Sequence, residues 1–388
     1  MQFLSMRQHS GLAMLLAALL AACQPKAIPM TPEETQRVET LTANMTTRCV
    51  GRYLIDMPQS FVLNSESTTE IEGVKVAVRP MDKHLFEMTL TGREAELRRT
   101  HMDGKPSRPF LKRIEVAPAI ALGKVFNRAE QSGAAEFGRT LELLAWQNGY
   151  EVRMSINATD GTDIPFDTSV IGTPFEASEK EVWDKYRSRN NTPEKLAHLL
   201  EVYERVSGRK DTEIPSVPGL CIPNGFVAGT DREGQETDAV YHLADAPDVW
   251  FGFGSSDAIK EDSTLLQRSP SAEKAMAKED AKLLRKGTRT IHGQEYEEVL
   301  MGNTLEQDGI RGSMFMMYGN ELRSDPLQPF VDLGFRNGDR IPVPELTMAE
   351  KDKLRLNEIL TKATLTDAEA VAIWDKVSAT LRPRPNAF

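Results

Sequence analysis

A short pattern that occurs twice, about 170 residues apart, divides this chain into two halves. The first copy is Thr47-Arg-Cys-Val-Gly-Arg-Tyr-Leu-Ile, and the second lies between Val217 and Ala228. In each copy a cysteine opens a short apolar run beside turn-forming residues, which predicts a strand. A period of this length is too long for a solenoid and fits two tandem domains of related design. Recurrence by chance is the alternative, and the matching order of predicted elements in the two halves argues against it.

The predicted elements indicate an α+β fold in which each domain has a mainly antiparallel sheet with helices packed on one face. We place the N-terminal domain at residues 48–210 and the C-terminal domain at residues 211–388, with a polar linker from Arg209 to Ser216. The clearest strands of the N-terminal domain are predicted at Tyr53 to Leu63, Val74 to Val78, Ile114 to Val125 and Arg139 to Ile156. Those of the C-terminal domain are predicted at Ala239 to Ile259, Tyr296 to Met301, Ile310 to Tyr318 and Phe330 to Phe335.

Capping residues mark the helix starts. A Ser or Thr three positions before Glu, or a Thr-Pro-Glu sequence, predicts helix starts at Thr31, Ser178, Thr192, Thr347 and Thr366. Charged runs predict two more helices, at Thr91 to Arg99 and at Ser271 to Lys286, with Gly287 ending the second.

The N-terminus predicts secretion and lipid attachment. Residues 1–22 have one charged residue, Arg7, before an apolar run that is too short to span a bilayer. The run ends in Leu20-Ala21-Ala22-Cys23, which resembles the bacterial lipobox, where the cysteine thiol receives diacylglycerol. We therefore expect a lipoprotein signal peptide at residues 1–22 and an acylated tether with a short helix at residues 23–47. An ordinary signal peptide that gives a soluble periplasmic protein is the alternative.

The residue after the lipid-modified cysteine bears on location. Several acyl chains hold a protein on a membrane far more firmly than one chain does. Gln24 stands where lipobox proteins retained at the inner membrane carry Asp. We therefore expect the protein in the periplasm, anchored at the outer membrane.

The mature chain is acidic. Removal of residues 1–22 leaves 366 residues with a formal charge of −11. A well-mixed acidic surface argues against binding to nucleic acid and against docking on anionic lipid. Such a surface suits a basic partner, although acidity for solubility alone is an equally good interpretation.

Two cysteines remain after Cys23, namely Cys49 and Cys221, and they lie in an oxidising compartment. If they pair with each other, the bridge ties the start of one domain to the start of the other. Two buried thiols with equivalent packing roles in the two domains are the alternative.

No pattern in the chain predicts catalysis, a metal site or a cofactor. A G-x-S-x-G nucleophile elbow, a Walker motif and an HExxH pair are all missing from the sequence. The five histidines of the mature chain are widely separated, and no cysteine is near enough to complete a zinc site. We therefore expect a protein that is not an enzyme.

A methionine-rich run, Ser313-Met-Phe-Met-Met-Tyr318, stands out in the second half. Alternation along a strand would put Met314, Met316 and Tyr318 on one face and the other side chains on the opposite face. Methionine fills an irregular core as readily as it adapts to a partner surface. The run therefore indicates either core packing or a partner-binding surface at Met314, Met316 and Tyr318.

Four groups of residues, taken in order, resemble a known family. They are Cys49-Val-Gly-Arg-Tyr53 with Pro58, Pro218-Gly-x-Cys221 with Gly225-Phe226, Gly293 with Glu297-Glu298, and Trp374 with Leu381-Arg-Pro-Arg384. This combination resembles the Tli immunity proteins, which neutralise type VI secretion lipase effectors of the fourth Tle class. The resemblance covers essentially the whole mature chain, including its division into N-terminal and C-terminal domains.

The resemblance implies an inhibitor whose partner is an α/β-hydrolase phospholipase delivered into the periplasm. In that family the two domains are said to clamp the enzyme and to stop its lid from opening. Linked domains that grip one target gain effective concentration from their connection. The resemblance transfers no interface position, because the matching residues look structural. An accessory outer-membrane lipoprotein that acts as an envelope or secretion scaffold is the alternative.

Overall fold

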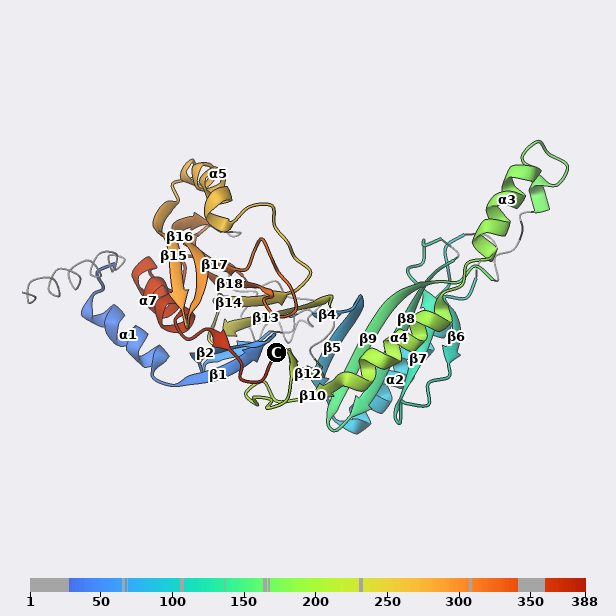
Figure 1. The fold of residues 1–388 in the computed structure, drawn as a ribbon, viewed down its shortest axis with the longest axis horizontal. Coiled ribbons are helices and arrows are strands. Elements are labelled where there is room, and N and C mark those ends of the chain that lie inside the picture. Colours follow the sequence, from blue (N-terminus) through green and yellow to red (C-terminus); the bar gives the residue numbers. More distant parts are fainter. Residues whose placement is uncertain are drawn as a thin grey trace, which may run out of the picture.

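The computed structural model describes residues 28–64, 67, 69–104, 108–135, 137–162, 166, 168–229, 233–306, 309–340 and 360–388. These residues form two lobes of sheet and helix that lie side by side along an elongated molecule (Figure 1). The first lobe contains β5 (Val74–Pro80), β6 (Leu111–Glu115), β7 (Gly123–Ala129), β8 (Gly138–Gln147), β9 (Tyr150–Thr159), α2 (Lys83–Arg99) and α4 (Thr192–Arg205). The second lobe contains β13 (Gln235–Leu243), β14 (Ala246–Ser256), β15 (Lys282–Ile291), β16 (Gln294–Leu305), β17 (Arg311–Gly319), β18 (Phe330–Asn337), α5 (Leu265–Ala277) and α7 (Asp367–Ser378).

Two helices lie at the outer ends of the molecule. The first, α1 (Pro32–Thr42), packs along α7 of the second lobe, where Arg37 forms an ion pair of 3.2 Å with Glu369. At the opposite end, α3 (Glu176–Arg187) follows the short 3-10 helix η1 (Thr168–Val170) and projects beyond the first lobe (Figure 1).

One antiparallel sheet runs through both lobes. Its strand order is β15-β16-β17-β18-β14-β13-β4-β5-β9-β8-β7-β6, with β3 (Phe61–Leu63) beside β13. The short strand β4 (Thr69–Ile71) makes the connection, because it pairs with β13 on one side and with the start of β5 on the other. The predicted α+β class with mainly antiparallel sheets in two tandem domains is confirmed.

Helices cover both faces of the sheet in each lobe, so the expectation that they lie on one face is wrong. In the first lobe, Leu143 of β8 packs into the core beneath α4, whereas its neighbour Leu144 packs into the core beneath α2. Successive side chains of a strand point to opposite faces, so α4 and α2 sit on opposite sides. In the second lobe, Phe315 of β17 joins the core beneath α7, and Met316 joins the cluster beneath α5.

The hairpin that opens each half of the chain is built into the lobe formed by the other half. The first hairpin, β1 (Met45–Val50) and β2 (Tyr53–Pro58), packs into the second-lobe core around Trp374. The second hairpin, β11 (Gly219–Ile222) and β12 (Gly225–Ala228), packs into the first-lobe core with α4. Short strands complete the exchange, because β10 (Val206–Gly208) pairs with β12 and β19 (Arg382–Pro383) pairs with β2.

The two hairpins meet around Cys49, Gly51 and Cys221, and we call this region the seam. Cys49 of β1 and Cys221 of β11 form a disulfide with an S–S distance of 2.01 Å. Together with their cross-strand partners Leu54 and Phe226 they make a small buried cluster of their own. The backbones of Gly51 and Cys221 exchange two hydrogen bonds of 2.8 Å beside the disulfide.

Three buried arginines, Arg52, Arg209 and Arg384, fasten the backbone around the seam. The guanidinium of Arg209 donates to the carbonyls of Cys49 and Gly225 at 2.9 and 2.8 Å, and also to three carbonyls of its own loop. The guanidinium of Arg384 donates to the carbonyls of Pro215, Val217 and Gly219. Burial lowers the pKa of all three groups. The predicted linker from Arg209 to Ser216 is therefore held by hydrogen bonds from its own first residue and from Arg384 near the C-terminus.

Some helix boundaries differ from the predictions for local reasons. Helix α2 begins at Lys83, well before Thr91, because Asp82 caps its first turn by accepting from two backbone N–H groups. Helix α3 begins at Glu176, so Ser178 lies inside it and does not cap it. The capping boxes at Thr31 and Thr366 are confirmed, and the one predicted at Thr347 lies outside the described residues.

Two further predictions are wrong over part of their length. The strand predicted from Ile114 to Val125 is interrupted, because β6 ends at Glu115 and β7 begins at Gly123. The charged helix predicted from Ser271 to Lys286 ends at Ala277, and Gly287 lies within β15. The largely exposed sequence of β15 is rich in Lys and Arg and looks like the charged face of a helix, which explains the error.

Candidate functional site

The methionine-rich run forms β17, and its alternation sends side chains to opposite faces of the sheet. Phe315 and Met317 are completely buried in the main core of the second lobe. Met314, Met316 and Tyr318 point to the other face and are half-buried. The alternation is therefore as predicted, and the three residues stay out of the main core. Their role in partner binding remains a prediction.

These three side chains line a cavity of about 560 Å³ between α5 and the outer face of β16, β17 and β18, which we call the methionine pocket. Its volume lies in the range typical of small-molecule or side-chain binding pockets. Its apolar walls include Leu265, Met276, Val299, Met301, Met314, Met316 and Phe330. Polar groups lie around them, contributed chiefly by Glu261, Arg268, Glu273, Tyr318 and Asp332.

Helix α5 is held to the sheet mainly at its beginning. The backbone N–H groups of Leu265 and Leu266 donate to carboxylates of Glu321 and Glu297, at 2.9 and 2.7 Å. Carboxylates are favoured at a helix N-terminus because they satisfy free donors and complement the helix dipole. Leu265 and Ser269 are the only residues of α5 that are fully buried. The later turns therefore stand away from the sheet and leave room for the pocket.

Among the described residues that line the methionine pocket, Arg268 is the one cation, and its charge is already balanced. Its guanidinium lies 5.4 Å from the centre of the Tyr318 ring and forms an ion pair of 2.5 Å with Glu321. Beside it, Glu273 forms an ion pair of 2.9 Å with Lys286 of β15.

Asp332 of β18 is the unusual acid of the pocket. Burial, together with the nearby carboxylate of Asp238, raises the pKa of Asp332 to about 7. Both carboxylates lie over Gly254 of β14, because a Cβ at Gly254 would come within 1.9 Å of Asp332 and 2.5 Å of Asp238. Only glycine leaves room for this arrangement.

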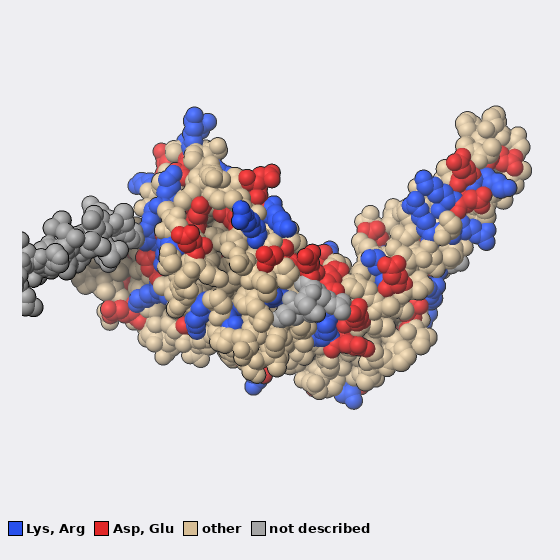
Figure 2. Space-filling model, in the orientation of Figure 1, with Lys and Arg blue, Asp and Glu red and all other residues tan. Residues whose placement is uncertain are grey.

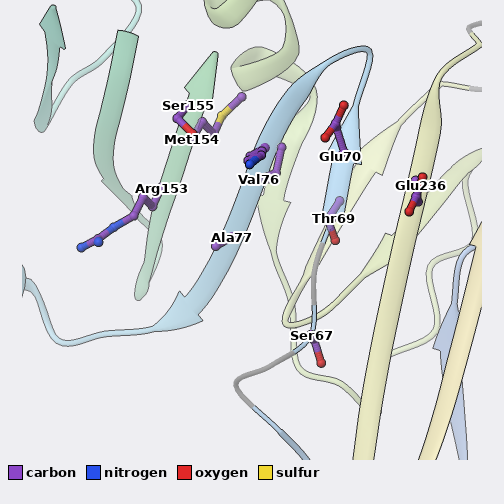
Figure 3. Close-up of a pocket in the computed structure, with 10 residues that line it drawn as sticks. Ser67, Thr69, Glu70, Val76, Ala77, Arg153, Met154, Ser155 and Glu236 are labelled. Atoms are coloured by element: carbon purple, nitrogen blue, oxygen red, sulfur yellow. The ribbon is translucent and has the colours of Figure 1, made fainter. Parts of the chain in front are cut away.

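A second hollow, of about 330 Å³, lies where the lobes join (Figure 3). It opens because β4 pairs with β5 only near their shared turn, while Thr69 turns towards Thr237 of β13 at 3.0 Å. Figure 3 shows Glu70 and Glu236 on neighbouring strands at one side, and Arg153 and Ser155 on β9 at the other. The molecule bends near this junction, and acidic and basic side chains are mixed over both lobes on the face that Figure 2 shows.

The predicted site residues fall in different places. Cys23 lies outside the described residues. Cys49 and Cys221 are joined in the seam, whereas Met314, Met316 and Tyr318 line the methionine pocket. Asp332 was missed, although its strand alternates Phe330-Val-Asp-Leu-Gly-Phe335, a pattern that could have shown a second face with an acid on it.

Within the described ranges, no group of three or more His, Cys, Asp or Glu residues is arranged to hold a metal ion. No helix in that part of the chain is long and apolar enough to cross a membrane.

Comparison with known proteins gives two family matches in tandem. The model of the Tle cognate immunity protein 4 N-terminal domain matches residues 46–209, and that of its C-terminal domain matches residues 213–386. No curated protein matches the chain.

Solved structures of immunity proteins have a similar fold. The apo structure of immunity protein TplEi of T6SS from Pseudomonas aeruginosa matches with 19% identity and a TM-score of 0.58, over 88% of this chain and 98% of that chain. A chain of the crystal structure of the Tle4-Tli4 complex matches with 18% identity and a TM-score of 0.60, over 89% of this chain and 99% of that chain. TplEi complexed with "L" peptide matches with 20% identity and a TM-score of 0.54, over 88% and 98% of the two chains.

Proposed function

Because this chain belongs to the Tle cognate immunity protein 4 family, we propose that it binds and inhibits a cognate phospholipase effector of a type VI secretion system in the periplasm. The observation that carries the proposal is the match of both domain models, in order, over residues 46–209 and 213–386. The inhibitor protects the producing cell and its kin from the lipase, and it performs no catalysis of its own.

The rigid connection between the two lobes supports a binding surface to which both lobes contribute. The continuous sheet, the disulfide and the buried arginines of the seam restrict movement of one lobe against the other. A surface that is ordered before binding loses less entropy when the complex forms. We expect an interface that buries more than roughly 1,600 Å², as in stable protein complexes.

Lipid attachment at Cys23 would place the inhibitor where the lipase acts. A lipase attacks phospholipid at the membrane surface, and an outer-membrane anchor keeps the inhibitor beside that surface. Replacement of Cys23 by Ser should move the protein from the membrane pellet to the soluble fraction. Retention of the variant in the pellet would contradict the anchor.

Co-expression with the lipase tests the function directly. The cognate lipase, which we would seek among the neighbouring reading frames by its G-x-S-x-G motif, is directed to the periplasm of a host cell, with or without the full chain, and survival is counted. A lipase with its catalytic serine replaced by Ala is the matched control, since it should leave both cultures alive. Equal killing by the active lipase with and without this chain would refute inhibition, and hydrolysis of a phospholipid by the purified chain would refute the non-enzymatic role.

A further inference from the structure

The methionine pocket is an apolar cavity with an excess of acidic groups around it. Five carboxylates lie in or beside it: three line the cavity, and two hold the start of α5. The cations paired with them are Arg268, which binds Glu321, and Lys286, which binds Glu273. Asp332 and Glu261 form no salt bridge with any residue that the structure describes. The pocket therefore has the charge of a receptor for a cation.

The walls of the pocket narrow the choice of cation. Methionine side chains are flexible and polarisable, so they adapt to an aliphatic chain that enters between them. Lysine and arginine have an apolar stem that packs on such walls and a charged end that seeks a carboxylate. A fatty acid would bring its own carboxylate against those already present, and a neutral chain would give the ionised form of Asp332 no countercharge.

We propose that the methionine pocket receives a lysine or arginine side chain of the effector, with its stem against the methionines and its charged end beside Asp332. The proposal rests on the proposed function for the identity of the partner, but not for the chemistry of the pocket. The pocket is larger than one such side chain, so a turn or helix that presents the cation with an apolar neighbour would fill it. Buried charge pairs and well-packed anchors of this kind carry much of the energy of an interface.

The groups that face Asp332 make cation binding depend on pH. The nearest are Asp238 and Glu236 of β13 and Tyr318 of β17, and around Tyr318 lie Arg268 of α5 and, in the adjoining loops, Glu261 and Glu321. A pKa of about 7 for Asp332 means that the free pocket loses a proton as the pH rises from 6 to 8. Binding of a cation should strengthen over the same range.

The pocket can be tested without the effector. The chain from Gln24 onward is labelled at its methionine methyl groups, and the signals are assigned with Met→Leu variants. Octylammonium, octanoate and octanol, which share one alkyl chain, are then titrated at pH 8 and followed by NMR. We expect octylammonium to shift the signals of Met276, Met301, Met314 and Met316 in a saturable way and to bind at least tenfold more tightly than octanoate or octanol. Met317 lies in the core and should not respond.

Two matched variants separate a specific carboxylate from general acidity. Asp332→Asn should weaken octylammonium binding at pH 8 at least tenfold and remove its dependence on pH. Glu70→Gln deletes one charge at the junction hollow and should leave the affinity within twofold. Equal binding of the three probes would overturn the proposal in favour of an ordinary apolar or lipid-binding cavity. Methionine signals that none of the probes shifts would also overturn it, because the cavity would then be closed to ligands.

Measurements with the effector distinguish failure of the pocket from failure of the proposed function. If the chain protects cells from the lipase, Asp332→Asn should weaken the complex at least tenfold. Protection with unchanged affinity of the Asp332→Asn variant would overturn the pocket and leave the inhibitor role standing. Failure of the wild-type chain to protect cells would overturn the inhibitor role. The probe titrations would still decide the chemistry of the pocket.

Discussion

Removal of the disulfide between Cys49 and Cys221 tests how the two halves of the chain are held together. The bridge closes a loop with a sequence separation of 172 residues. In the chain-entropy account, a loop of this length restricts the unfolded chain enough to stabilise the fold by about 5 kcal/mol. Residual structure in the unfolded chain reduces this figure, so we expect a loss of about 3–5 kcal/mol on removal of the bridge.

Two forms of the protein separate the bridge from the packing of its sulfur atoms. Wild type refolded under reductant loses only the covalent bond, because both buried sulfur atoms remain. The Cys49→Ala/Cys221→Ala variant also loses the sulfur contacts within the small cluster that includes Leu54 and Phe226. This further loss should add about 1 kcal/mol.

Equilibrium unfolding in urea, followed by circular dichroism and tryptophan fluorescence, measures both effects. The expected order of unfolding free energy is oxidised wild type, reduced wild type, then the double Ala variant. The slope with urea should rise when the bridge is absent, since the unfolded chain becomes more expanded. A reduced protein within about 1 kcal/mol of the oxidised one would refute the reasoning, because it would show that the loop is already restricted without the bond.

In urea titrations, the Asp332→Asn variant should be more stable than wild type by about 2 kcal/mol at pH 8, a value reduced to allow for solvent screening. Near pH 4 the two proteins should be equally stable. The sign follows because the folded-state pKa of about 7 exceeds the ordinary value of 3.8, so the stabilisation from protonation is complete below pH 4 and is lost as the pH rises through 7. Arg209→Lys should lower the unfolding free energy by about 2–3 kcal/mol, since an ammonium cannot reach the six carbonyls to which the guanidinium now donates. The control Arg98→Lys, on the exposed side of α2, should change the unfolding free energy by less than about 0.5 kcal/mol. Gly254→Ala should lower the unfolding free energy by about 1–3 kcal/mol, because the added Cβ would meet two carboxylates. The control Gly252→Ala, on the same strand, should lower it by less than about 1 kcal/mol, because the added Cβ meets only Trp250, at 3.5 Å.

The repeat around the cysteines could be recognised from sequence, but the exchange of hairpins could not. Cys49 and Cys221 occupy the same position in their hairpins, each opposite an apolar residue across a short turn. This local pattern could be recognised in the sequence, and it predicted the two related domains. Both hairpins are apolar enough to pack on either lobe, so their sequences contain no information about which lobe receives them.

The same limit applies to the candidate site. Alternation along β17 predicted which face Met314, Met316 and Tyr318 would share. The helix that covers this face was predicted about six residues too late, because Ser271 to Lys286 looked like a charged helix. Asp332 looked like a solvated strand residue, and only its position beside Asp238 and Gly254 across two strand pairs shows why it is unusual.

The residues that carry the family resemblance explain why recognition of the family did not reveal an interface. Cys49, Arg52, Cys221 and Arg384 all lie in the seam, where they hold the two lobes together. Their chemistry is required by the architecture, because buried guanidinium groups and carbonyls must satisfy one another wherever the chains cross. Residues that contact an effector have no such internal requirement and are free to change with it. The architecture therefore fixes the residues of the seam and leaves the lobe surfaces, including the methionine pocket, free of such a requirement.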